Sequence, residues 1–133
     1  MMDGESTVNY VFYQNEATGA ISYEFIGDGV WGKISGIITL ESDFETIINI
    51  SIISQVETPG LGGIVAEENY LKQFIGKSFI ENEIYIIKKD SVENAQNEVD
   101  AISGATRTSS SFNVILNTSY QAYKDAWMTR LEG

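Results

Sequence analysis

The sequence predicts an α+β domain: an antiparallel sheet of about five strands, built from hairpins, with a short helix and a long C-terminal helix packed on it. Two observations lead to this prediction. β-Rich runs follow one another in the first half with only short turns between them, and consecutive hairpins favour an antiparallel sheet. The second half ends in apolar residues spaced by three and four, as in an amphipathic helix. The 133 residues contain no repeat and no long linker, so residues 1–133 fit a single domain.

The strands are predicted from aromatic and β-branched runs. The first two runs flank the turn at 15–19 and form one hairpin, and a glycine-rich loop at 27–29 leads to the second hairpin. In that hairpin, one face carries apolar residues of both strands. The four runs are residues 9–14, 20–26, 33–41 and 46–55, and the shared apolar face comprises Ile34, Ile38, Leu40, Ile47 and Ile53.

A proline–glycine loop and a short helix follow. The only proline lies in the loop 57–63, which must bend tightly. Residues 64–75 predict a short helix that Gly76 ends. Its residues expected toward the core are Leu71, Phe74 and Ile75.

The last third predicts a strand, a loop and the long helix. Residues 84–87 form the fifth strand, and the acidic residues 89–100 form a surface loop. The long helix runs from Ser109 to about Leu131. Its apolar face comprises Phe112, Ile115, Leu116, Tyr120, Tyr123 and Trp127.

Composition excludes several function classes. The formal charge of −11 argues against nucleic acid and anionic lipid, since both need a basic surface. The chain has neither cysteine nor histidine, which removes zinc sites built on those ligands, thiol nucleophiles and imidazole-dependent triads. No calcium-loop spacing is present, so we predict no metal site. No run reaches the roughly 20 apolar residues needed to cross a bilayer.

Residues 100–110 carry the strongest functional signal. Small residues and several hydroxyls stand where the long helix begins. Small residues let a backbone approach a ligand, and a helix N-terminus offers unpaired N–H groups to a phosphate. The segment therefore predicts a phosphate site, or a phosphoester on a hydroxyl.

Three motifs, in order, resemble the FMN-binding domains, whose members include flavin-carrying subunits of the sodium-pumping NADH:quinone oxidoreductase and of the Rnf electron-transport complex. Residues 103–109, Ser-Gly-Ala-Thr-Arg-Thr-Ser, preceded by Asp100, resemble the family's flavin-attachment motif. Residues 29–32, Gly-Val-Trp-Gly, are similar to a Gly-Leu-Trp-Gly loop. Residues 57–62 match a Glu-Thr-Pro-Gly-Leu-Gly loop at each position. The resemblance spans residues 27–127.

The resemblance implies a flavin site. It implies that a flavin transferase joins FMN through its phosphate to Thr106, and that Thr58 and Leu61 meet the isoalloxazine ring. Where family members often carry histidine, this chain has Gln55, which removes any proton-linked tuning by that residue. The expected cofactor-binding residues are Thr106, Ser103, Gly104, Ala105, Thr108, Glu57, Thr58, Gly60, Leu61, Gly62 and Trp31.

Each motif also has a purely structural interpretation. Thr106, Thr108 or Ser109 could cap the helix, and the proline–glycine loop could be a simple turn. Trp31 could be a core residue or a wall of the cofactor site. Asp100 could belong to a solvated loop, or to the surface that the transferase recognises, as the resemblance implies.

The resemblance implies an electron-transfer domain without independent catalysis. Its partners would be the flavin transferase and other subunits of a membrane-bound, ion-translocating complex. We expect the domain outside the cytoplasmic membrane, held by a helix that precedes this chain. The alternatives are a sensory, regulatory or accessory FMN-binding module, and an interaction domain that has lost its flavin.

Overall fold

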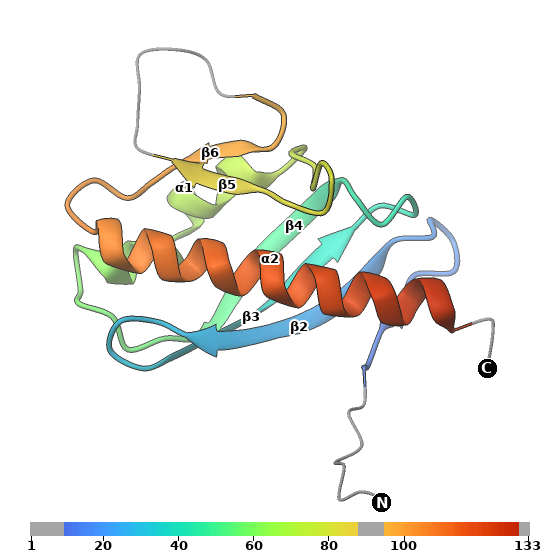
Figure 1. Ribbon diagram of the computed structural model, residues 1–133, viewed down its shortest axis with the longest axis horizontal. Coiled ribbons are helices and arrows are strands. Elements are labelled where there is room, and N and C mark those ends of the chain that lie inside the picture. Colours follow the sequence, from blue (N-terminus) through green and yellow to red (C-terminus); the bar gives the residue numbers. More distant parts are fainter. Residues whose placement is uncertain (1–9, 88–94, 131–133) are drawn as a thin grey trace, which may run out of the picture.

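The computed structural model describes residues 10–87 and 95–130, and its larger sheet has four antiparallel strands in sequential order. Each strand pairs with the next along the chain, as expected for consecutive hairpins (Figure 1). The strands are β1 (Tyr13–Gln14), β2 (Ile21–Asp28), β3 (Lys33–Leu40) and β4 (Ile47–Ser54).

The helices lie on one side of this sheet. The longest, α2 (Thr106–Thr129), runs across the sheet face in Figure 1. A segment of short helical turns follows β4, and it consists of η1 (Gly62–Ala66), α1 (Glu68–Leu71) and η2 (Lys72–Phe74). The predicted α+β class and the long C-terminal helix are confirmed.

The core lies between α2 and the sheet. Alternate residues of β2 point inward, and the inward face of α2 meets them. Tyr120 stacks on Phe79 with ring centroids 3.8 Å apart, and Tyr123 stacks on Tyr23 at 4.2 Å. Aromatic rings bury large areas and add specific ring-pair geometry, so they dominate the packing here.

The fifth strand does not join the larger sheet. Strand β5 (Tyr85–Ile87) pairs in parallel with β6 (Glu98–Asp100), which lies at the end of the segment expected to be a loop. Two amides of α2 satisfy the backbone around β5: Asn113 accepts the Ile86 N–H and Asn117 accepts the Ile84 N–H, each at 2.8 Å. The helix thus takes the place of a further strand. Residues 88–94 of the expected loop lie outside the described residues.

Two apolar residues predicted to be buried are exposed. Ile53 is 57% exposed, because register shifts between β3 and β4 place it opposite no partner: Gly36 pairs with Ile52 and Ser35 with Ser54. Ile75 is 53% exposed, because the predicted continuous helix breaks into three short turns and Ile75 itself is extended. Both predictions were wrong, whereas Leu71 and Phe74 are buried as expected.

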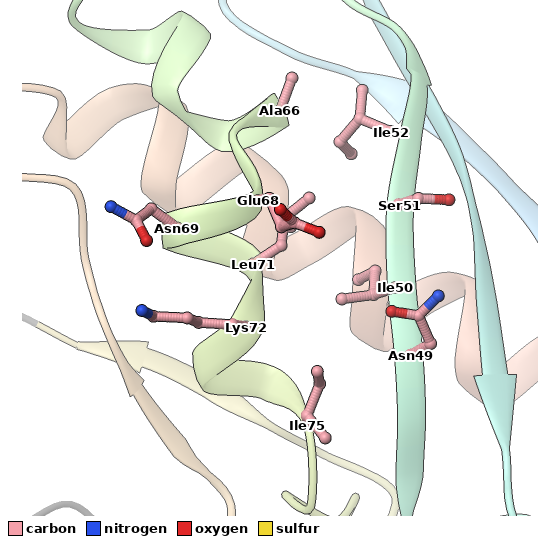
Figure 2. Close-up of a pocket in the computed structure, with 10 residues that line it drawn as sticks. All are labelled: Asn49, Ile50, Ser51, Ile52, Ala66, Glu68, Asn69, Leu71, Lys72 and Ile75. Atoms are coloured by element: carbon pink, nitrogen blue, oxygen red, sulfur yellow. The ribbon is translucent and has the colours of Figure 1, made fainter.

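The helical segment after η1 also covers the outer edge of β4. Uncovered edges invite pairing with other chains, and a helix alongside is one common protection. A groove of about 530 Å³ remains between β4 and this segment, with Ile50 and Ile52 facing Leu71 and Ile75 across it (Figure 2). None of the three motifs contributes to this groove.

Across residues 10–87 and 95–130, no helix combines the length and apolar character needed to span a bilayer.

Candidate functional site

The three motifs meet at the N-terminal end of α2. In Figure 1 the loops 29–32 and 57–63 both lie beside the first turn of this helix. Together they enclose an open pocket of about 430 Å³, within the range of small-molecule sites. Its lining comprises Val30, Trp31, Thr58, Leu61, Gly62, Gly104, Ala105, Thr106, Arg107 and Thr108.

Thr106 is the first residue of α2, and its side chain is exposed at the pocket. It caps nothing: Ala105 occupies the N-cap position, and no side-chain cap bond is made there. Gly104, just before it, has φ +79°, a conformation that favours glycine. The Thr106 hydroxyl therefore faces the pocket at a sharp turn of the backbone, as a modification site requires.

The other two hydroxyls of the first helical turn point inward. Ser109 accepts the Ile102 N–H at 2.9 Å and donates to the Ala105 carbonyl at 3.0 Å, which ties the motif loop to the helix. Thr108 donates to the Glu57 carboxylate at 2.7 Å. The capping interpretation thus fits Ser109 in part, and it does not fit Thr106.

Glu57 joins the three motifs. Its side chain is only 3% exposed, and its carboxylate accepts three hydrogen bonds from two other segments. The Val30 N–H donates to Oε1 at 3.2 Å, the Trp31 N–H to Oε2 at 3.0 Å, and the Thr108 hydroxyl to Oε1. Burial alone would raise the pKa of Glu57, but the bonds from Thr108, Trp31 and Val30 outweigh it and lower that pKa. The carboxylate is therefore ionised at neutral pH.

The pocket walls combine apolar and polar groups. Trp31 is 69% exposed and Leu61 is 46% exposed, and both line the pocket. The core interpretation of Trp31 is therefore wrong. The Thr58 carbonyl accepts the N–H groups of Leu61 and Gly63 at 3.0 and 2.8 Å, which fixes the proline–glycine bend.

Eight of the predicted cofactor-binding residues line this one pocket: Trp31, Thr58, Leu61, Gly62, Gly104, Ala105, Thr106 and Thr108. Three do not. Ser103 lines two neighbouring pockets, Gly60 lies at the exposed tip of its loop, and Glu57 lies behind the wall. The structure brings these residues together; their contacts with FMN stay predictions.

Two further predicted positions are defined by backbone contacts. Gln73 brackets the Asp100 backbone, accepting its N–H at 3.0 Å and donating to its carbonyl at 3.5 Å. Gln55 accepts the Glu57 N–H at 2.7 Å, so the residue at the family's histidine position shapes the loop behind the pocket.

A family model described as "FMN-binding domain" matches residues 29–121, more than half of the chain. The chain belongs to the FMN-binding domain family.

Relatives of this FMN-binding domain include NqrC proteins, which are subunits of a Na(+)-translocating NADH-quinone reductase. The domain is 34% identical over 106 residues to such a subunit of Vibrio vulnificus, covering 77% of this chain and 42% of that protein. The solved NqrC of Shewanella oneidensis matches with a TM-score of 0.71 at 28% identity, over 76% of this chain and 48% of that one. The structure of the corresponding reductase subunit from Parabacteroides distasonis gives 0.75 at 28% identity, over 86% and 59%. The FMN-binding domain thus spans about half the length of the relatives it matches.

Sequence reasoning missed the Glu57–Thr108 pair and the pocket residue Val30. A signal for the pair was present. Thr108 lies four residues before Phe112, so helical periodicity places both on the same inward face of α2. A buried hydroxyl on that face needs an acceptor, and Glu57 supplies it.

Proposed function

We propose that this FMN-binding domain carries FMN covalently on Thr106 and serves as a fixed electron carrier within a membrane-bound oxidoreductase complex. The observation that carries the proposal is the position of Thr106. Its exposed hydroxyl stands at the pocket where all three family motifs converge.

The residues present fit the cofactor. Trp31 and Leu61 offer flat apolar cover for a ring system, and Thr58 offers polar groups at its edge. Arg107 and the N-terminus of α2 lie next to Thr106, where they favour a phosphate group by on the order of 1 kcal/mol. A phosphodiester there carries about one negative charge, which these two features offset.

Attachment needs an activated flavin donor, because direct condensation of FMN with a hydroxyl would expel hydroxide. A flavin dinucleotide is such a donor. The Thr106 oxygen forms a bond to the flavin-bearing phosphorus, the phosphoanhydride bond breaks, and a nucleoside monophosphate leaves. The hydroxyl proton goes to a base of the flavin transferase, since no carboxylate lines this pocket among the described residues.

When bound, FMN supplies one- and two-electron redox chemistry, and the protein supplies position and electrostatics. The lining residues include no carboxylate within the described ranges, and the buried Glu57 is ionised at neutral pH. The domain therefore has no evident acid of its own to protonate a substrate. This favours a carrier over an independent reductase.

The partners and the location belong to the same proposal. The relatives named above are subunits of a sodium-translocating NADH-quinone reductase, which suggests a complex of that type for this chain. We propose the extracytoplasmic face of the membrane as its site. Reporter fusions to the full-length gene test this, and alkaline phosphatase activity on the cytoplasmic side alone would contradict it.

The test of attachment is the intact mass after co-expression with a flavin transferase. We expect one FMN, less one water, on the wild-type chain, and in-gel fluorescence that survives denaturation. Thr106→Ala should abolish both signals. Ser110→Ala, an exposed hydroxyl of the same helical turn, is the matched control and should load fully. Covalent flavin on the Thr106→Ala protein would refute the assignment.

A further inference from the structure

Behind the pocket wall lies a carboxylate that burial makes costly. Glu57 is 3% exposed, and no lysine or arginine of the described residues forms an ion pair with it. A buried charge is tolerated when hydrogen bonds replace its water. Here three donors do so, and they come from two segments far apart in the sequence, the loop 29–32 and α2.

The carboxylate is already engaged by the protein. Oε1 accepts from Val30 and Thr108, and Oε2 accepts from Trp31. Glu57 itself is absent from the pocket lining, whereas all three of its donors belong to it. Any influence of Glu57 on the pocket therefore passes through these neighbours.

Two motif glycines make room for this cluster. A Cβ added at Gly29 would lie 2.9 Å from Glu57 Oε2, and one added at Gly62 would lie 2.4 Å from Thr108 Oγ1 and 3.0 Å from Glu57 Cβ. Real side chains do not approach so closely without displacement. Both glycines thus allow the loops to close around the Glu57–Thr108 pair.

We propose that Glu57 is the positioning residue of this pocket: its carboxylate fixes the Trp31 loop to the first turn of α2, so the pocket is formed before FMN arrives. The inference rests on the proposed function only in taking this pocket as the FMN site. A preformed site avoids the cost of ordering loops on binding. The role is distinct from contact with the flavin, since Glu57 acts through the backbone of the loop.

The flavin-free full chain tests this directly. Its two tryptophans, Trp31 at the pocket and Trp127 near the far end of α2, give separate ¹⁹F signals after 5-fluorotryptophan labelling. In Glu57→Gln, the amide nitrogen must face one of the N–H donors, so one bond is lost. We expect the Trp31 signal to move toward its position in the denatured chain, while the Trp127 signal stays in place.

A second set of variants avoids reliance on Glu57→Gln folding. Thr108→Val removes the hydroxyl at nearly constant shape, and Thr108→Ser keeps it. We expect Thr108→Val to shift the Trp31 signal and Thr108→Ser to restore it. Ser109→Ala removes a buried hydroxyl of the same turn that does not touch Glu57, and it should leave Trp31 unmoved.

An unchanged Trp31 signal in Thr108→Val would overturn the proposal. So would equal shifts of Trp31 and Trp127, or an equal effect of Ser109→Ala, because either result would mean general loosening. The flavin-free measurement is independent of attachment at Thr106. Failure of this inference can therefore be told apart from failure of the proposed function.

Discussion

The two ends of α2 are held by different kinds of contact. At the C-terminal end, Tyr120, Tyr123 and Trp127 stack against rings of the sheet side. At the N-terminal end, Thr108 and Ser109 replace rings with hydrogen bonds to Glu57 and to the motif loop. Ring packing fills space, whereas hydrogen bonds fix positions and leave the neighbouring volume open. The difference shows how one helix stabilises the fold at one end and forms a pocket at the other.

The largest effect is expected at the aromatic end. Phe44 is fully buried and packs against Tyr120 and Trp127, with centroid distances of 5.8 and 5.7 Å. Phe44→Ala should lower the free energy of unfolding by about 3–5 kcal/mol, because it leaves a cavity. Urea unfolding measures this, with the exposed Met128→Ala as control. A loss below about 1 kcal/mol would show that this end is not the main source of stability.

A smaller, pH-dependent effect is expected at the pocket end. Glu57→Gln should lower the free energy of unfolding by about 1–3 kcal/mol at neutral pH, because a buried donor loses its acceptor. The pKa of Glu57 is lowered in the folded protein from its ordinary value of 4.5, so its contribution is present above that pH and is lost as the pH falls through the folded pKa. The difference between wild type and variant should therefore shrink in acid.

Urea unfolding of both proteins, from neutral pH to below pH 4.5, tests this. Asp43 retains its own acid dependence in both, because its pKa is also lowered: burial opposes the shift, and hydrogen bonds from Thr46 and Glu45 outweigh it. The exposed Glu68→Gln is the control. A difference between wild type and Glu57→Gln that stays constant with pH would count against an ionised, hydrogen-bonded Glu57.

The smallest change in stability, with a spectroscopic effect, is expected at the pocket surface. Leu61→Ala should alter the free energy of unfolding by no more than about 0.5 kcal/mol, since the side chain is half exposed. If Leu61 covers the flavin ring, the absorbance or potential of FMN held at Thr106 should shift. Ile75→Ala, an equally exposed side chain at the groove of Figure 2, should shift neither. An unchanged spectrum and potential in Leu61→Ala would place Leu61 away from the ring.

Local patterns predicted much of the fold. Alternation in β2 and β3 and the helical spacing of Phe112 to Trp127 identify the faces that pack together. The misses arise from long-range contacts. Ile53 is exposed because of a register shift that depends on the partner strand, and β5 pairs with β6 through only three residues each, too few to show a pattern.

The site was predicted by resemblance, not by periodicity. Nothing in the spacing of Trp31, Leu61 and Thr106 requires them to share a pocket, yet the structure brings them together. What escaped prediction was the polar contact behind them. Glu57 reads in sequence as one acid among many, and only the fold shows that its oxygens face Thr108 and the backbone of Trp31.

The length of α2 separates the pocket from both described ends of the chain. With 24 residues at about 1.5 Å each, the helix measures roughly 36 Å. Tyr10 packs edge-on against Tyr123, and Arg130 follows α2 directly, so both ends lie beside the aromatic part of the helix (Figure 1). A tag, fluorophore or surface linkage attached at either end would therefore serve as a handle on the side remote from the pocket. Thr106 would stay open to an enzyme or an electrode.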